Sequence, residues 1–203
     1  MTASASVPTD LFGGALHVHL PPDYLDASTV REVPSTQEVF VPATTSTDTS
    51  IIIDILEPPL PIAPSTGAPS DGNPDLAALQ IHWDDIASPH ASHVFSITPV
   101  AALGARAWCV LGTVEGGGGG GGGGYTAILA TVIRLERVKT DLVVSVNVPI
   151  SATEAARERS VCAPGSAERG NGGEMGEALR AGCDIRDLLL GTLEVRDWGL
   201  FVN

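Results

Sequence analysis

Apolar and polar side chains alternate in several short runs of the chain, and this spacing predicts β-strands. In residues 15–20, leucine and valine alternate with two histidines, so a strand with one buried face is expected. Residues 37–41 predict a second strand, after a stretch from 23 to 35 with room for one helical turn. Residues 50–57 make the strongest prediction, because β-branched side chains follow one another almost without interruption. This strand is expected to be central in a sheet and covered on both faces.

The second half of the chain is also rich in β-forming residues. Residues 94–98 and 107–114 predict two further strands. Residues 125–135 and 142–148 are two long β-rich runs that flank the polar sequence ERVKTD. This arrangement is typical of an antiparallel hairpin.

Helix-start signals occur at three places. Asn73 followed by Pro74 suits an N-cap and a first helical residue, and apolar side chains recur after them at helical spacing. Ser151 and Glu154 match a capping box, which predicts a short helix. Residues 177–194 place most of their apolar side chains on one stripe, so a helix that packs on the sheet is expected.

Three low-complexity segments separate these elements and predict loops. Residues 58–74 are rich in proline, residues 116–124 are nine consecutive glycines, and residues 158–176 are rich in glycine. The glycine run lacks the lysine of a phosphate-binding loop. With 203 residues in all, the chain is expected to form a single domain over residues 1–203.

The charge of the chain limits the classes of partner. Its formal net charge is −13, which disfavours nucleic acid and anionic membrane surfaces as partners. Residues 1–100 contain 12 acidic side chains and a single basic one, Arg31, whereas residues 101–203 contain 12 acidic and 10 basic ones. A basic protein partner is therefore expected to approach the N-terminal half.

Cysteine content and hydropathy bear on the compartment. Three cysteines at wide spacing predict neither a disulfide framework nor a zinc site, and they fit a reducing compartment. No signal peptide and no apolar run long enough for a membrane span is recognisable.

Catalytic and metal-binding motifs are missing from the sequence. Two pairs of histidines occur, but His17 and His19 are expected on the solvent face of a strand, and no convergent third ligand is apparent. No motif for a nucleophilic serine or cysteine is present. The three tryptophans lie within or beside apolar patterns and are expected in the core. We expect no enzymatic activity, no cofactor and no metal.

Asp54 is the residue that most needs an explanation. A carboxylate inside an Ile-rich strand costs several kcal/mol unless it is paired or solvated. An internal cation could satisfy it, or the strand could end sooner than its apolar run suggests. Alternatively, Asp54 is displayed at the end of the strand with Glu57 and binds a Lys or Arg of a partner. Strict alternation places the two carboxylates on opposite faces, so they share one surface only if the strand ends or twists before Pro58.

Several short segments follow one another in a specific order along the chain. They are LFGGA at 11–15, PDYLDAS at 22–28, REVP at 31–34, QEVF at 37–40, SIIIDILE at 50–57, IRL at 133–135, TD at 140–141 and VNVP at 146–149. Together these segments resemble the Ran guanine nucleotide release factors, which are Mog-type nuclear import proteins.

The resemblance implies an α/β sandwich, in which a mostly antiparallel sheet of about six strands is flanked by helices on both faces, as in PsbP-like proteins. It implies binding of the small GTPase Ran, promotion of guanine nucleotide release, support of nuclear import, and presence in nucleus and cytoplasm. The family's D-x-x-E motif for Ran binding maps onto Asp54 and Glu57. Asp26, Arg31 and Glu38 belong to the matching N-terminal block.

Our leading hypothesis is a monomeric, non-enzymatic regulator that docks its acidic face on Ran. The rival hypothesis is an adaptor with the same fold that binds another basic protein and leaves its nucleotide alone. A photosynthetic role like that of PsbP proteins is disfavoured, since no transit peptide is recognisable.

Overall fold

The computed structural model describes residues 6–44, 48–59, 73–115, 124–154 and 176–201. Its main feature is a seven-stranded sheet in the order β3-β4-β5-β9-β8-β7-β6, in which every pairing is antiparallel. Its strands are β3 (Tyr24–Asp26), β4 (Gln37–Pro42), β5 (Ser50–Leu56), β6 (Ser92–Ala102), β7 (Ala105–Glu115), β8 (Tyr125–Leu135) and β9 (Thr140–Ile150). The described strands at 37–42 and 50–56 and the hairpin of β8 and β9 confirm those predictions.

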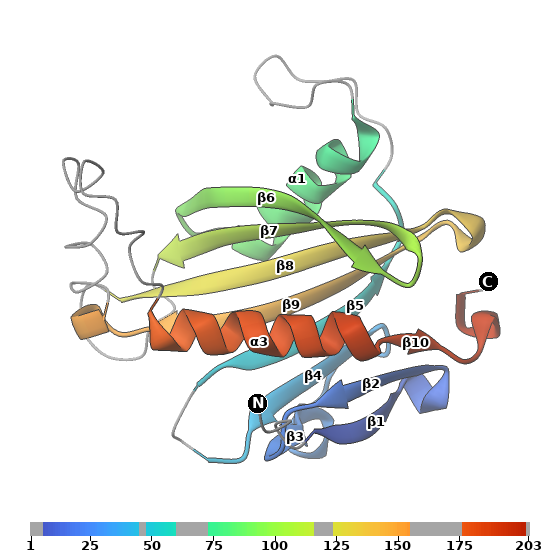
Figure 1. Ribbon diagram of the computed structural model, residues 1–203, viewed down its shortest axis with the longest axis horizontal. Helices are drawn as coiled ribbons and strands as arrows, with labels where there is room; N and C mark the ends of the chain where they lie inside the picture. The colour runs from blue at the N-terminus through green and yellow to red at the C-terminus, as the bar shows by residue number, and fades with distance from the viewer. Residues whose placement is uncertain (1–5, 45–47, 60–72, 116–123, 155–175, 202–203) are drawn as a thin grey trace.

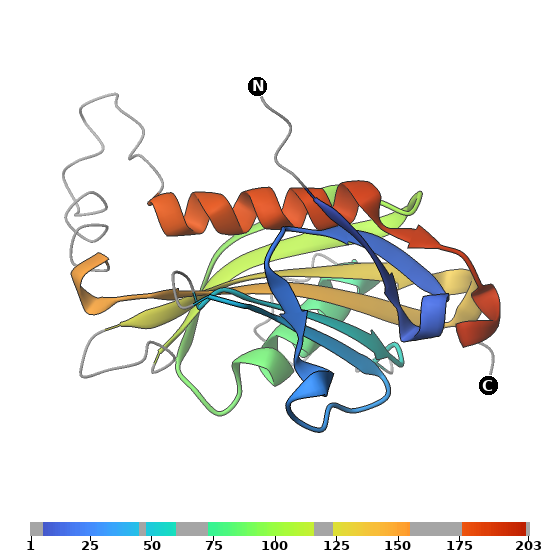
Figure 2. The same ribbon diagram turned by 90° about the horizontal axis from the view of Figure 1, so that it is seen from below.

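Two helices cover opposite faces of this sheet (Figures 1 and 2). α1 (Pro74–Ala87) begins at the predicted cap, where the Asn73 side chain accepts a hydrogen bond from the backbone N–H of Asp75. It packs on β7 and β8, whereas α3 (Glu177–Thr192) packs on β8, β9 and β2. The expected α/β sandwich with helices on both faces is confirmed, and the sheet has seven strands where about six were expected.

A second, three-stranded sheet lies beside the main one in the order β1-β2-β10. Its strands are β1 (Val7–Leu11), β2 (Leu16–Leu20) and β10 (Glu194–Val195). β2 confirms the strand predicted at 15–20, but β1 falls in a segment for which no element was predicted. The only β1 side chain that is fully buried is Leu11, so the apolar pattern of this segment is too weak to predict a strand. Both histidines of β2 are half-buried, which is less exposed than expected.

Short 3₁₀ segments turn the chain between these strands. They are η1 (Phe12–Gly14), η2 (Ala27–Thr29), η3 (Glu136–Val138) and η5 (Trp198–Phe201). η2 confirms the helical turn expected between residues 23 and 35. At residues 151–154 the capping box is present, because Ser151 Oγ accepts from the Glu154 N–H and the Glu154 carboxylate accepts from the Ser151 N–H.

The strands predicted at 94–98 and 107–114 are present but longer than predicted. β6 is the edge strand, and most of its side chains are exposed, so its ends carry no apolar pattern. Gly112 of β7 allows a close approach of α1, because a Cβ at this position would lie 2.3 Å from the ring of Trp83. Trp83 is buried as expected, whereas Trp198 is 39% exposed, contrary to the prediction that it lies in the core.

The core has two parts, one on each side of the main sheet. The larger part lies between the sheet, α3 and the small sheet, and the smaller part lies under α1. In β5, Ile51 and Ile53 face the larger part and are fully buried, whereas Ile52 on the other face is only half-buried. The expectation that this strand is covered on both faces was therefore wrong for the α1 side, because α1 packs on β7 and β8 rather than on β5.

The three predicted loops at 58–74, 116–124 and 158–176 lie outside the described residues for nearly all of their length. No helix in the described part of the chain is long and apolar enough to cross a membrane. Within the same residues, no cluster of His, Cys, Asp and Glu side chains is suited to hold a metal ion.

Candidate partner-binding site

Asp54 lies near the end of β5, on the face of the sheet that α1 only partly covers. Its cross-strand neighbours are Gln37 of β4 and Val143 of β9. The carboxylate is half-buried, and its Oδ1 accepts a hydrogen bond of 2.7 Å from Gln37 Nε2. Burial raises the pKa of Asp54, and the hydrogen bond from Gln37 and the attraction of His82 offset this only in part. In the described residues, no cation forms an ion pair with Asp54.

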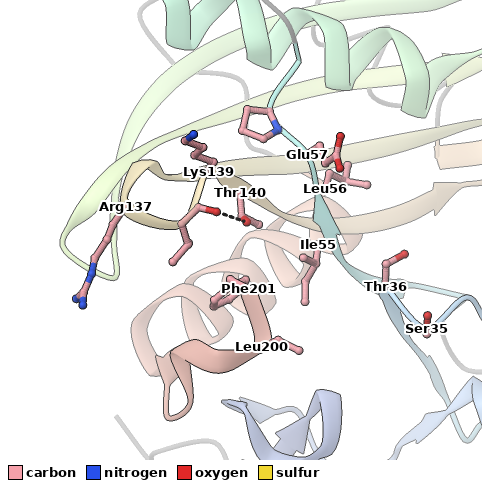
Figure 3. A pocket seen from close by; sticks show the side chains of 12 residues that line it. Ser35, Thr36, Ile55, Leu56, Glu57, Arg137, Lys139, Thr140, Leu200 and Phe201 are labelled. Carbon is pink, nitrogen blue, oxygen red and sulfur yellow. Dashed lines mark hydrogen bonds between the residues drawn. The ribbon is translucent and has the colours of Figure 1, made fainter. Parts of the chain in front are cut away.

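Glu57 follows the last residue of β5 directly and is exposed. It lines a groove of about 810 Å³ between the end of β5, the β8–β9 turn and η5 (Figure 3). The lining residues are Ser35, Thr36, Ile55, Leu56, Glu57, Pro58, Arg137, Val138, Lys139, Thr140, Leu200 and Phe201. No ion pair involves Glu57 within the described part of the chain, so this carboxylate is available to a partner.

The two carboxylates flank the end of one strand but are not on one flat surface. Alternation along β5 places Asp54 on the α1 side and Ile55 on the α3 side. The strand ends at Leu56, and Glu57 lies beside Ile55 in the groove. A single partner would therefore have to reach around the end of β5 to contact both carboxylates.

The other three predicted site residues lie in the N-terminal block. Asp26 caps η2, because its Oδ1 accepts a hydrogen bond of 2.8 Å from the Ser28 N–H. Glu38 pairs with Ile53 across β4 and β5, and its Oε1 accepts a hydrogen bond of 2.6 Å from the Phe12 N–H. Both carboxylates accept a hydrogen bond from a backbone N–H of the protein itself, and Glu38 lies on the opposite face of the sheet from Asp54.

Arg31 is the fifth predicted residue, and it lies just after η2. Its side chain is exposed and has no ion-pair partner among the described residues. Beside it, Val30 is 80% exposed, and Leu25 of β3 is 54% exposed. The structure thus does not gather the five predicted residues into one cluster. It places Asp54 and Glu57 at the end of β5 and Asp26, Arg31 and Glu38 along β3, η2 and β4.

A network of charged side chains that the sequence analysis missed lies under α1. Arg134 of β8 donates two hydrogen bonds to Asp141 of β9, of 3.0 Å from Nε and 2.9 Å from Nη2. His82 of α1 donates to the same carboxylate at 2.9 Å. Asp75, also of α1, forms ion pairs with Arg134 at 3.4 Å and with Arg106 at 3.0 Å. His82, whose attraction acts on the pKa of Asp54, is thus hydrogen-bonded to Asp141.

The spacing of the network residues could have indicated part of it. Arg134 and Asp141 flank the predicted turn symmetrically and are directly opposite each other in the hairpin. Opposite charges at paired positions of a hairpin stabilise it. The contribution of α1 could not be anticipated, because it depends on how the helix lies across the sheet.

Comparisons with known proteins agree with this architecture. The family model described as "Ran-interacting Mog1 protein" matches residues 9–149. The nuclear import protein MOG1 of Saccharomyces cerevisiae is 29% identical over 160 residues, which cover 73% of this chain and 68% of that protein. The Ran guanine nucleotide release factor of Homo sapiens is 31% identical over 150 residues, which cover 68% of this chain and 74% of that protein.

A solved structure supports the same relationship. The crystal structure of the Saccharomyces cerevisiae Ran-binding protein Mog1p superposes with a TM-score of 0.71 at 26% identity, covering 98% of this chain and 100% of that one. The family match spans well over half of the 203 residues and includes the whole of β5 with Asp54 and Glu57. The chain belongs to the family of Ran-interacting Mog1 proteins.

Proposed function

We propose that this protein binds the GTPase Ran, promotes release of its guanine nucleotide and supports nuclear import, acting in nucleus and cytoplasm as a regulator rather than an enzyme. Its family is described as Ran-interacting, and its relatives are named nuclear import proteins and Ran guanine nucleotide release factors. The observation that carries the proposal is the pair of carboxylates at the end of β5, Asp54 and Glu57, neither of which forms an ion pair within the described residues.

The binding of this protein to Ran promotes nucleotide release only if the protein binds nucleotide-free Ran more tightly than nucleotide-bound Ran. A factor that weakens nucleotide binding is itself bound more weakly when nucleotide is present, by the same factor. The protein therefore prefers nucleotide-free Ran, and release follows from this preference without any chemical step on the protein.

The two carboxylates contribute to binding in different ways. Glu57 is exposed, so its pairing with a basic side chain gives steering and orientation more than affinity. Asp54 is half-buried and carries a cost of burial that Gln37 offsets only in part. A Lys or Arg of Ran that docks over Asp54 would offset the rest of this cost, so the contact at Asp54 is the stronger of the two.

The direct test measures the affinity of nucleotide-free Ran for three variants, Asp54→Asn, Glu57→Gln and the double variant. We expect a loss of about tenfold or more for Asp54→Asn, a smaller loss for Glu57→Gln and the largest loss for the double variant. Glu115→Gln is the matched control, because Glu115 is an exposed acidic residue at the opposite end of the sheet, where it pairs with Tyr125. Circular dichroism is used to check that each variant is folded. Wild-type affinity of the double variant would contradict the assignment of this site.

A second measurement distinguishes the adaptor hypothesis from the release-factor hypothesis. Ran loaded with a fluorescent guanine nucleotide is mixed with the protein, and the rate of fluorescence change is followed. Acceleration by the wild type but not by the double variant supports a release factor. Tight binding to Ran with an unchanged release rate would favour the adaptor.

A further inference from the structure

The groove beside Glu57 has walls of opposite charge. Glu57 and Pro58 come from the end of β5, and Arg137 and Lys139 come from the β8–β9 turn (Figure 3). Both cations are exposed, and no ion pair joins either of them to Glu57 in the described residues. Arg31 also lacks an ion-pair partner among the described residues, but it lies apart, just after η2, whereas Arg137 and Lys139 come from one turn and line one groove.

Four arginines elsewhere in the described residues show the contrast. Arg106, Arg134, Arg186 and Arg196 each form at least one ion pair. Each therefore has a role in holding the protein's own structure. No ion pair involves Arg137 or Lys139 in the part of the chain that the structure describes, and both residues line the groove.

Arg137 is oriented by an aromatic neighbour. Its guanidinium carbon lies 5.8 Å from the centre of the Trp198 ring, a cation–π distance. Trp198 is 39% exposed, and tryptophan and arginine are the residue types most enriched among the dominant contacts of protein interfaces. The turn itself consists of η3 and of Lys139, which adopts the left-handed region at φ 50°.

The floor of the groove is apolar. Ile55, Leu56, Val138, Leu200 and Phe201 line it. Its volume of about 810 Å³ is in the range that accommodates side chains or a small ligand. An occupant with only one sign of charge would be repelled by one wall, which argues against a nucleic acid or an anionic lipid surface.

We propose that this groove binds an extended segment of Ran in which acidic side chains pair with Arg137 and Lys139, an apolar side chain covers the floor, and a basic side chain pairs with Glu57. This inference rests on the proposed function, and it adds a cationic half to a site that the sequence indicated only as acidic. The two walls would fix the direction in which the segment lies.

Lys139 allows a sharp test because it is the only lysine in the sequence. A carbodiimide reagent joins an amine to a carboxylate that touches it, without a spacer. We expect treatment of the complex with nucleotide-free Ran to link the Lys139 amine to an acidic residue of Ran, identified by mass spectrometry. Lys139→Arg keeps the charge, so it should bind Ran normally but lose this cross-link.

Charge reversal gives the second readout. The double variant of Arg137→Glu and Lys139→Glu should bind Ran about tenfold more weakly, with most of the effect lost at high salt. Arg180→Glu is the matched control, because the first turn of α3 lies at the other end of the molecule from the β8–β9 turn (Figure 1). Control and double variant carry reversed charge on exposed side chains, so a general electrostatic effect would appear in both.

The outcomes separate the two proposals. Binding of Ran by the wild type, with a Lys139 cross-link and a selective loss in the double variant, supports the groove. Binding of Ran with no Lys139 cross-link and an unchanged affinity of the double variant overturns the groove and leaves the proposed function standing. If the wild type does not bind nucleotide-free Ran at all, both proposals fail.

Discussion

Two aspartates on neighbouring strands, Asp54 of β5 and Asp141 of β9, show how differently the structure treats the same side chain. Both face α1, and both are attracted by His82. Burial by itself raises the pKa of each. For Asp141, hydrogen bonds from His82 and Arg134 outweigh this burial and lower its pKa below the ordinary value. For Asp54, the single hydrogen bond from Gln37 is not enough, and its pKa is raised.

The difference distinguishes a carboxylate that stabilises the fold, Asp141, from one that is available to a partner, Asp54. Asp141 is fully buried and saturated by a bidentate arginine and a histidine, so it joins α1 to the β8–β9 hairpin. Asp54 is half-buried, and the folded protein disfavours its charged form. A side chain whose charge is disfavoured in the free protein gains the most when a partner supplies a cation, which supports the proposed role of Asp54 in binding.

The largest expected effect comes from breaking the structural half of this comparison. Asp141→Ala leaves Arg134 and His82 under α1 without their carboxylate, which costs about 3 to 5 kcal/mol of unfolding free energy. Chemical denaturation measures the loss. Asp85→Ala, which removes an exposed carboxylate of α1, is the control and should change stability by about 0.5 kcal/mol or less. Equal stability of the two variants would contradict the structural role of Asp141.

The next effect tests how closely α1 is seated. In Gly112→Ala, the added Cβ would meet the Trp83 ring at 2.3 Å and the His93 carbonyl oxygen at 2.9 Å. Overpacking of this kind costs about 1 to 3 kcal/mol. Gly191→Ala is the control, because a Cβ at Gly191 of α3 meets nothing within 4 Å and alanine favours a helix. The control should be neutral or stabilising by up to about 1 kcal/mol, and a similar loss in both would mean that α1 is not tightly seated.

The opposite pKa shifts predict opposite pH dependences. Because the pKa of Asp141 is lowered, its stabilising contribution is present above the ordinary aspartate pKa of about 3.9 and is lost as the pH falls below it. Asp54 has a raised pKa, so its contribution is present below about 3.9 and is lost as the pH rises through its folded value. Thermal denaturation of Asp141→Asn and Asp54→Asn between neutral pH and pH 3 should give difference curves of opposite slope. Curves of the same slope would contradict the assignment.

The smallest effect on stability is expected when the carboxylate available to a partner, Asp54, is replaced. Asp54→Asn keeps the shape of the side chain and removes a charge that the fold disfavours, so the free energy of unfolding at neutral pH should be unchanged or higher by about 0.5 kcal/mol. The same variant should weaken Ran binding, so stability and binding move in different directions. A clear loss of stability in Asp54→Asn would place Asp54 with Asp141 as a structural residue.

Local patterns predicted the elements that carry strong apolar periodicity. Such patterns predicted the 50–57 strand, the 125–148 hairpin and the Asn73 cap, because each of these depends on side chains close together in sequence. β1 and β3 were not identified, since they have few buried side chains and are held by pairing with distant segments. The acidic half of the candidate site followed from one carboxylate in an Ile-rich strand, whereas its cationic half depends on how the β8–β9 turn lies against β5.

By itself, the sequence determined that this chain is rich in β-strands, carries an excess of negative charge and has an aspartate in its most apolar strand, since composition and periodicity are properties of neighbouring residues. The sandwich was implied only by the resemblance to a known family. Only the tertiary structure decided which carboxylates are neutralised. Asp141 and Asp75 are paired with arginines that cross-strand register and helix docking bring to them. Asp54 and Glu57 form no ion pair in the described residues, since Arg134 is engaged by Asp75 and Asp141, and Arg137 and Lys139 come from another wall of the groove.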